Sequence, residues 1–411
     1  MRKIIARAKN WILGSLPAFK GRNYRLHVLG QIISSSGTWL QNVVMGWYAW
    51  ELTKSATLTA IIIALPRCVS AGLTIFGGIL SDKFDKRSLL YATSFFGMVQ
   101  AMVLGYLAIN QLKQVEVVIA LSFCLGLINA VDGPARHSFL TEIVSYREIR
   151  QASSFNSAIG QSSQFVGSIL GILLFDSIGI GWTFVLNGFS FMALIFMLWM
   201  IRIDKKPKQR KHQDSSLRMF SEGVKYVFSQ SRILTCLMLI GSLNFFGFSY
   251  RGILPIISEQ IFHAGSGYYS GFMACAGAGA FFGSFISSAK SEKAFTIFVV
   301  YGSVIIGFAL IAFSMAHVLF LGMVLMFVIG FGLTLSASSV RGECQELMSA
   351  DMRGRVNGFV MMCALGGTGF GGIFTGKLTE MLGCQLALAI NGVALIIIAL
   401  VVFLYEKVRR K

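Results

Sequence analysis

The sequence predicts an all-α membrane protein in which twelve transmembrane helices form two bundles of six. Three observations lead to this fold class. The 411 residues are 55% hydrophobic and 13% charged, a balance far from that of a soluble domain. Apolar stretches of about 20 residues, the length that crosses a bilayer, recur along almost the whole chain. One long basic segment, 202–232, separates the first six stretches from the last six.

The expected elements follow in chain order. Residues 1–24 form a basic amphipathic segment that we expect to lie on the cytoplasmic surface. The first bundle covers 25–201, the linker 202–232 contains an amphipathic helix, the second bundle covers 233–405, and 406–411 form a basic tail. The twelve spans are expected at 25–50, 57–80, 88–110, 115–140, 153–175, 183–201, 233–258, 268–289, 295–315, 317–341, 353–381 and 384–405.

The distribution of positive charge predicts the orientation. With both termini in the cytoplasm, 31 of the 36 Lys and Arg residues fall in inside segments, and the outside connections hold only Lys54, Lys113 and Lys377. Cytoplasmic loops carry the excess of Lys and Arg in membrane proteins, so we expect a multi-pass protein of the bacterial inner membrane. The membrane therefore explains the net charge of +18, and we expect no nucleic acid partner.

Two basic residues, Arg67 and Arg251, fall inside apolar spans rather than at their ends. An Arg near the centre of a membrane helix costs about 3 kcal/mol or more, so each should face water, a carboxylate or a ligand. Two fixed guanidiniums favour a substrate with carboxylates or other anionic oxygens. For Arg251, a side chain that extends to the membrane surface is the alternative.

A carboxylate and a base lie one helical turn apart in the fourth span. Asp132 and Arg136 have the i, i+4 spacing at which an ion pair forms. An isolated carboxylate in a membrane is costly, so pairing is expected, and a proton on Asp132 would change the partners of Arg136. The sequence leaves open whether this pair couples transport to protons or is purely structural.

The loop after the second span carries a recognisable motif. Residues 78–87 read GILSDKFDKR, which resembles the G-x-x-x-D-x-x-x-[RK]-[RK] loop of the major facilitator superfamily. The resemblance implies two six-helix bundles around a central cavity that opens to each side in turn. It also implies that conformational gating depends on Gly78, Asp82, Lys86 and Arg87. The matching loop of the second half has Ser287 in place of the acid, so any latch would be one-sided.

Further segments narrow the resemblance. Residues 22–55 and 129–139 resemble the branch that contains the enterobactin exporter and macrolide efflux proteins, often called transmembrane secretion effectors. In this superfamily the first, fourth, seventh and tenth spans line the central cavity. The resemblance therefore adds substrate-binding candidates to the two intramembrane arginines, namely Gln31, Thr38, Trp39, Gln41, Asn42, Asn244 and Tyr250. Hydrogen bonding between helices is the alternative role for the polar side chains.

These observations predict a secondary transporter that works by alternating access and is not an enzyme. We expect proton-coupled export of a small anionic or amphiphilic molecule, and a carboxylate-type siderophore is the sharpest expectation. Multidrug or macrolide-type efflux is one alternative, and import of a siderophore or another organic anion is the second. The sequence has no Walker-type phosphate loop, and its His and Cys residues lack metal-ligand spacing. We therefore expect no direct drive by ATP, no metal site and no cofactor. We also expect a monomer.

Overall fold

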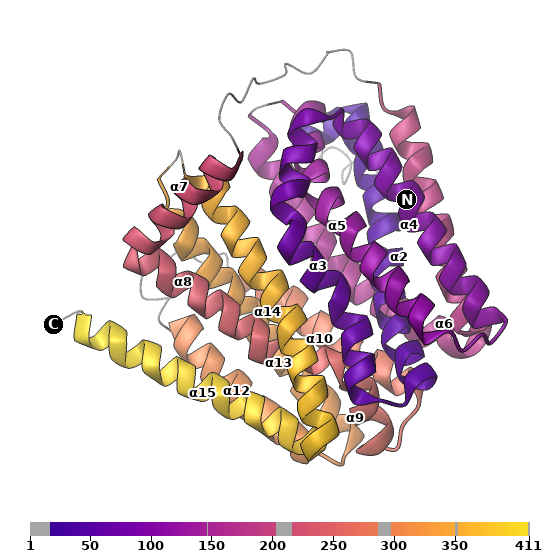
Figure 1. Cartoon of the computed structure of the whole chain (residues 1–411), viewed down its shortest axis with the longest axis vertical. Helices are drawn as coiled ribbons and strands as arrows, with labels where there is room; N and C mark the ends of the chain where they lie inside the picture. Colours follow the sequence, from indigo (N-terminus) through magenta and orange to yellow (C-terminus); the bar gives the residue numbers. More distant parts are fainter. Residues whose placement is uncertain (1–16, 146, 203–215, 287–296, 350–351, 410–411) are drawn as a thin grey trace, which may run out of the picture.

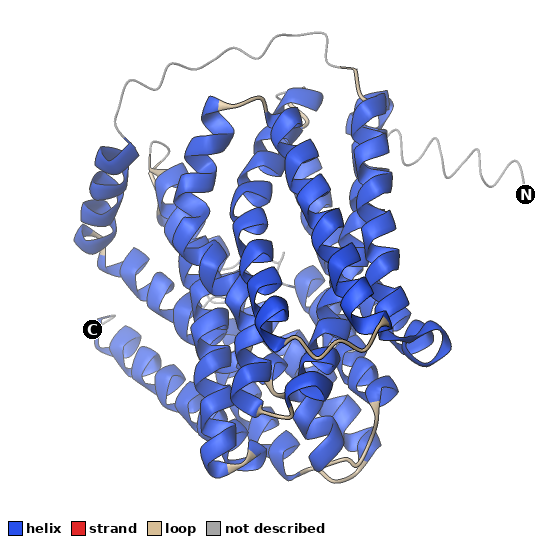
Figure 2. Cartoon of the chain, turned by 45° about the vertical axis from the view of Figure 1, so that its right-hand side comes forward, coloured by secondary structure: helices blue, strands red, loops and turns tan. Residues whose placement is uncertain are grey.

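The chain folds as an all-helical membrane protein, as predicted. The computed structural model describes residues 17–145, 147–202, 216–286, 297–349 and 352–409. Every regular element of this part of the chain is a helix (Figure 2). Nine helices in it are long and apolar enough to cross a membrane, and Val299–Met315 is a shorter apolar helix. The amphipathic segment expected at the start of the chain lies mostly outside the described residues.

The first bundle contains six spans in five continuous helices. After the short 3-10 helix η1 (Pro17–Lys20) they are α2 (Arg22–Thr53), α3 (Ala56–Lys83), α4 (Lys86–Ile109), α5 (Val115–Ile143) and α6 (Ile149–Met200). The fifth and sixth spans, Gln151–Phe175 and Ser177–Met200, merge into α6. The merged helix kinks at Gly179, near the start of the sixth span, with φ 80° and ψ 167°, a conformation open essentially to glycine alone.

The second bundle begins with a broken span. The sequence predicts one continuous helix at 233–258, but the structure divides this span into four segments. They are α8 (Ser231–Ser242), the π-helical η2 (Leu243–Gly247), the 3-10 helix η3 (Ser249–Gly252) and α9 (Leu254–Gln260). Pro255 lies in the first turn of α9, where a missing N–H costs no helical hydrogen bond. Departures from α-helical winding often mark functional sites.

The remaining spans of the second bundle are α-helices, except that the ninth span begins with the π-helical η4. They are α10 (Ser266–Ile286), η4 (Ile297–Tyr301) continued by α12 (Gly302–Met315), α13 (Leu319–Leu347), α14 (Arg353–Leu382) and α15 (Cys384–Arg409). Figure 1 shows this bundle, coloured from red through orange to yellow, beside the first bundle in indigo to magenta. The fold is that of two six-helix bundles, as the sequence predicts.

The linker contributes one helix that packs on the second bundle. This helix, α7 (Ser216–Ser229), ends next to the start of α8. Arg355 Nη1 donates to Glu222 Oε2 at 2.8 Å, and the backbone N–H of Ser349 donates to Tyr226 Oη at 3.2 Å. We call the end of the molecule at which α6 finishes and α7 begins the linker end, and the opposite end the far end.

The two bundles touch at the far end and diverge toward the linker end. The contacts between them run mainly along α3 with α14 and α6 with α10. A Cβ placed on Gly376 would lie 2.3 Å from Cβ of Ala60, whereas one on Gly366, nearer the linker end, would lie 3.5 Å from Cβ of Ala71. One on Gly354 would meet no described atom within 4 Å. Small residues permit this close approach at the far end.

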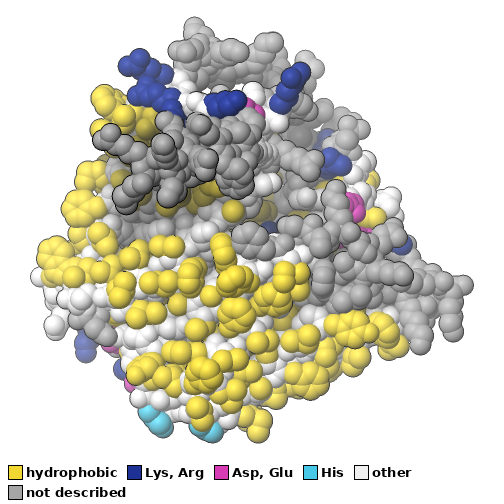
Figure 3. Space-filling model, turned by 180° about the vertical axis from the view of Figure 1, so that it is seen from behind, with side chains coloured by type: hydrophobic (Ala, Val, Ile, Leu, Met, Phe, Trp, Pro, Cys, Tyr) yellow, Lys and Arg dark blue, Asp and Glu magenta, His cyan; other side chains and the backbone are white. Residues whose placement is uncertain are grey.

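The surface matches a protein embedded in lipid. Figure 3 shows hydrophobic side chains over the middle of the visible face, with Lys and Arg gathered mainly toward one end. Many of the outward-facing side chains are large and apolar, and Phe320 is 76% exposed. A soluble protein rarely exposes so large a continuous apolar surface to water. This band of hydrophobic side chains therefore lies in the bilayer.

Candidate transport site

Arg67 faces the interior of the first bundle. It lies on α3 directly after Pro66, and its Nη1 donates to the carbonyl of Ile63 at 2.9 Å. The side chain borders a small enclosed cavity of about 30 Å³, which Asn42 of α2 and Ser122 of α5 also line. A cavity of this size holds a water molecule or two. Arg67 therefore lies within the protein and not against lipid.

Arg251 reaches across the boundary between the bundles. It lies on η3, and its Cζ is 4.9 Å from the ring centroid of Phe248 and 5.6 Å from that of Trp39 on α2. Cation–π contacts of this kind orient a guanidinium and partly offset its burial. Nε of Arg251 is buried and has no hydrogen-bond partner in the structure. The break in the seventh span thus places Arg251 at the interface, in a 3-10 turn instead of an α-helical one.

The two arginines lie near each other, together with two phenols. Their charges are close enough to repel one another, and both interact electrostatically with Tyr269 of α10. The side chain of Tyr250 is 1% exposed, and its hydroxyl has no partner. No carboxylate of the described residues forms an ion pair with Arg67 or Arg251. Tyr269 is not among the residues predicted from the sequence, because nothing there distinguishes it from other aromatic residues in apolar spans.

The polar candidates on α2 differ in what they contact. Gln41 is buried among amides of its own bundle, because its Nε2 donates to Gln100 Oε1 at 3.0 Å and Asn187 Nδ2 donates to its Oε1 at 2.6 Å. Oγ1 of Thr38 donates to the carbonyl of Ser34 at 2.9 Å. These hydrogen bonds join helices or lie within one helix, so they favour packing roles for both residues. Gln31 is also buried, but its Oε1 has no partner.

Asn244 is likewise engaged by its own bundle. Its Nδ2 donates to the carbonyl of Ile240 at 2.8 Å, and Thr368 Oγ1 donates to its Oδ1 at 3.0 Å. Of the predicted binding residues, Asn42 lines the cavity beside Arg67, and Trp39 contacts Arg251. Gln31 and Tyr250 each keep a buried polar atom with no partner among the described residues.

Asp132 and Arg136 form the expected ion pair on α5. The hydroxyl of Thr93 on α4 donates a second hydrogen bond to Asp132 Oδ1 at 2.8 Å. His27 of α2 is buried close to both charges, and its two ring nitrogens have no hydrogen-bond partner. Its ring centroid is 5.6 Å from that of Phe139. The structure thus adds an imidazole to the pair, which the position of His27 near a helix start had not suggested.

The motif loop joins α3 to α4 and is fastened within the first bundle by its bases. Lys86 Nζ lies 2.8 Å from Glu142 Oε1 of α5. Arg87 Nη2 donates to the carbonyls of Leu198 at 2.8 Å and Trp199 at 3.1 Å, near the end of α6.

The acid of the same motif is unengaged in this conformation. Asp82 is exposed and makes no hydrogen bond or ion pair with any described residue. A Cβ on Gly78, one turn earlier, would meet no described atom within 4 Å.

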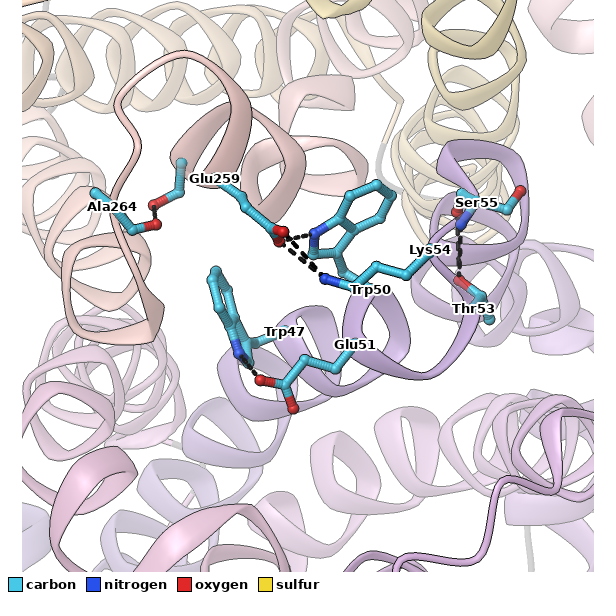
Figure 4. Close-up of polar contacts among 9 residues, drawn as sticks. Trp47, Trp50, Glu51, Thr53, Lys54, Ser55, Glu259 and Ala264 are labelled. Atoms are coloured by element: carbon cyan, nitrogen blue, oxygen red, sulfur yellow. Dashed lines mark hydrogen bonds and ion pairs between the residues drawn. The ribbon is translucent and has the colours of Figure 1, made fainter.

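The far end is closed by contacts between the bundles, which Figure 4 shows in close-up. Lys54 Nζ lies 3.1 Å from both carboxylate oxygens of Glu259, and Trp50 Nε1 donates to the same carboxylate. On the neighbouring helix pair, Thr57 Oγ1 donates to Glu380 Oε2. Residues of α2 and α3 are thereby tied to α9 and α14.

Two bundles that are latched at one end and apart at the other, with unpaired polar groups between them, define a membrane transporter of the major facilitator type. The model of the transmembrane secretion effector family matches residues 14–410. The chain belongs to this family.

The curated relatives are transporters and not enzymes. The chain is 24% identical over 407 residues to the uncharacterized MFS-type transporter YfiS of Bacillus subtilis (strain 168), a match that covers 95% of each chain. It is 22% identical over 229 residues to the staphyloferrin A transporter of Staphylococcus aureus (strain NCTC 8325 / PS 47), which covers 55% of this chain and 57% of the relative.

Solved structures show the same fold at low sequence identity. A bacterial homolog of the human lysosomal transporter Spinster, in an inward-facing and unoccupied conformation, matches with a TM-score of 0.73 and 14% identity over 94% of this chain and 97% of that one. A POT family transporter in complex with 5-aminolevulinic acid matches with a TM-score of 0.73 and 12% identity over 95% and 97% of the two chains.

Proposed function

We propose that this transporter exports small molecules that carry carboxylate groups, with a carboxylate-type siderophore as the sharpest candidate, and that protons drive the export. The observation that carries the proposal is the pair Arg67 and Arg251. They lie near each other, Arg67 inside the first bundle and Arg251 at the boundary between the bundles, with no carboxylate partner among the described residues. The relative named for staphyloferrin A supports a substrate of this kind.

The energetic argument concerns two positive charges held together in a membrane interior. An uncompensated buried guanidinium is expensive, and a second one nearby adds repulsion. A substrate carboxylate would remove both costs at once, because each guanidinium can grip it through two parallel hydrogen bonds. Trp39 and Phe248 both contact the guanidinium of Arg251, which reduces the entropy lost when a ligand binds.

The conformation fits loading from the cytoplasm. Under the orientation that the basic loops predict, the end at which the bundles diverge faces the cytoplasm, and the latched end faces outside. An anionic substrate would enter from the linker end and neutralise the arginines. Asp132 and Arg136 lie toward that end on α5, where a proton on Asp132 would break their ion pair and give Arg136 a new partner.

Binding measurements on purified protein test this proposal. Arg67→Gln and Arg251→Gln should each weaken binding of a citrate-containing siderophore by tenfold or more, roughly the value of a charge-assisted hydrogen bond. The Lys variants should bind with intermediate affinity, because Lys keeps the charge but loses the planar fork. Arg353→Gln, at an exposed position at the start of α14, is the matched control.

Other outcomes would select an alternative function. If both Gln variants bind the siderophore like the parent while a neutral macrolide binds tightly, the protein is a multidrug-type efflux pump. If the carboxylate binds but is moved only into cells, the protein is an importer with the same binding site.

A further inference from the structure

A second hollow lies at the far end of the first bundle, separate from the arginine pair. It has a volume of about 650 Å³. Its walls come from the last turn of α2, the connection between α4 and α5, and the kink of α6 around Gly179. A Cβ on Gly179 would meet no described atom within 4 Å, so the kink leaves this space open.

A lipid-facing groove continues from this hollow along α6. The groove has a volume of about 490 Å³, and Ile178 and Trp182 line both spaces. Trp182, Leu186 and Phe189 follow one another at spacings of four and three residues, so they form a stripe on one face of the helix. They are 58%, 43% and 51% exposed. Because this face belongs to a membrane span, acyl chains must cover it.

The hollow carries one charge of each sign. Glu51 of α2 lines it, and Oε1 of this carboxylate accepts a hydrogen bond from Trp47 Nε1 at 2.6 Å. Its second oxygen has no partner among the described residues. Lys113, in the connection between α4 and α5, also lines the hollow and makes no ion pair or hydrogen bond with any described residue. Both residues are exposed, so a ligand that carries both an ammonium and an anionic group can reach them.

We propose that the hollow and the groove together bind one phospholipid with an ethanolamine headgroup. The lipid ammonium donates hydrogen bonds to the free oxygen of Glu51, and the phosphate accepts from Lys113. One acyl chain lies along the stripe of Trp182, Leu186 and Phe189. Trp182 lines both the hollow and the groove, and Trp is enriched at the boundary between lipid headgroups and acyl chains.

The choice of an ethanolamine headgroup follows from the charges of Glu51 and Lys113. A choline headgroup has the same charges but no N–H to donate to Glu51, and a phosphatidylglycerol headgroup has no cation at all. An ethanolamine headgroup satisfies both residues with charge-assisted hydrogen bonds.

The site adjoins the contacts that close the far end. Trp47, which holds Glu51, has its ring centroid 6.0 Å from that of Tyr269 in the second bundle. Ser266 at the start of α10 also lines the hollow. A bound lipid would therefore stabilise the packing of Trp47 between the bundles.

Native mass spectrometry and thermal unfolding of the full chain test the proposal. The protein is delipidated in detergent and titrated separately with phosphatidylethanolamine, phosphatidylcholine and phosphatidylglycerol of identical acyl chains. Phosphatidylethanolamine should bind as a single retained molecule about fivefold to tenfold more tightly than either of the others. It should also raise the Tm of the parent protein.

Substitutions separate this site from general lipid contact. Glu51→Gln keeps an acceptor for Trp47 but removes the charge, and it should abolish the preference for phosphatidylethanolamine, as should Lys113→Gln. Glu116→Gln is the control, since Glu116 is exposed at the start of α5 and does not line the hollow. Equal retention of the three lipids, or an unchanged preference in both Glu51→Gln and Lys113→Gln, would overturn the proposal and leave annular lipid only.

Discussion

Buried charges carry most of the functional argument at the scale of single residues. The lipid-facing positions are apolar, and the charges within the bundles are few, so each one has to be compensated. Asp132 is compensated by Arg136 and Thr93. Arg67 and Arg251 have aromatic neighbours and a backbone carbonyl, but no counter-charge among the described residues. This contrast separates an ion pair that is complete within the first bundle from two arginines that have no internal counter-charge among the described residues.

The first prediction concerns Asp132. Asp132→Asn fixes the uncharged state, so Arg136 loses its counter-charge permanently. Transport driven by a pH gradient should be abolished, while exchange of substrate across the membrane without a gradient should persist. Both rates are measured in proteoliposomes, with Glu116→Gln as the matched acid-to-amide control. A variant that retains the full dependence on the pH gradient would remove Asp132 from the coupling mechanism.

The sequence predicts the individual site residues less well than it predicts the fold. Arg67 and Arg251 could be singled out because a charge inside an apolar stretch is rare. Tyr269 could not, since an aromatic residue in an apolar helix is ordinary. Gln31 and Gln41 look alike in the sequence, and only the tertiary fold shows that the amide of Gln41 is held by Gln100 and Asn187. Which polar side chains are free depends on neighbours from distant helices, and a single sequence does not contain that information.

At the scale of elements, helix α3 connects the two arginines' site to the contacts at the far end and to the motif loop at the linker end. Its first turns pack closely against α14 at the far end, its middle carries Arg67, and its last turn carries Asp82. The following helix, α4, is anchored to α5 and α6 by Lys86 and Arg87. A tilt of α3 would therefore move the site and the motif loop together.

The second prediction concerns Asp82, which has no partner in the present conformation. We expect it to bind across the bundle boundary when the linker end closes, at a helix N-terminus or a base. Asp82→Asn should lower turnover roughly tenfold, equivalent to about 1.4 kcal/mol, and leave the Kd for substrate within about twofold, because a latch biases one state without touching ligand. A large loss of affinity at unchanged turnover would contradict this role.

The third prediction concerns the latch at the far end. Glu259→Gln removes the charge attraction to Lys54. Because the ion pair is exposed, the ratio of molecules with the far end closed to those with it open should fall by about fivefold at most. Spin-label distances between the far ends of α4 and α14 should then show a larger open population. The exchanged pair Lys54→Glu with Glu259→Lys should recover much of the closed state. If the distances in Glu259→Gln equal those of the parent, the ion pair does not hold this end shut.

At the scale of the whole molecule, hydropathy and charge predicted the architecture well. The all-α class, the six-plus-six arrangement and the transporter class are all confirmed. The departures from α-helical geometry within the spans were not predicted, because the hydropathy of an apolar stretch is the same whether it forms an α, π or 3-10 helix. The break at η2 and η3 is such a case. The kink at Gly179 lies where a connection between two spans was expected, but its φ of 80° could not be foreseen.

The fourth prediction is the orientation of the molecule. Both termini and the linker should face the cytoplasm, because 31 of the 36 basic residues then lie inside. Single cysteines placed in the linker and at Lys113, in a variant without native cysteines, are labelled in intact spheroplasts with a membrane-impermeant maleimide. Only the cysteine at position 113 should react. Labelling of the linker from outside would show that the topology is the reverse of the predicted one. The linker end would then face the outside of the cell.

Transport by oriented proteoliposomes tests the central claim most directly. Protein is reconstituted with the linker end outward, a citrate-containing siderophore is added outside, and an acidic lumen supplies the proton gradient. The account predicts accumulation of the siderophore that collapses with a protonophore and falls at least tenfold in both Arg67→Gln and Arg251→Gln, but not in Arg353→Gln. Undiminished accumulation in the two arginine variants would show that the pair does not bind the substrate, and the anion-export account would be wrong.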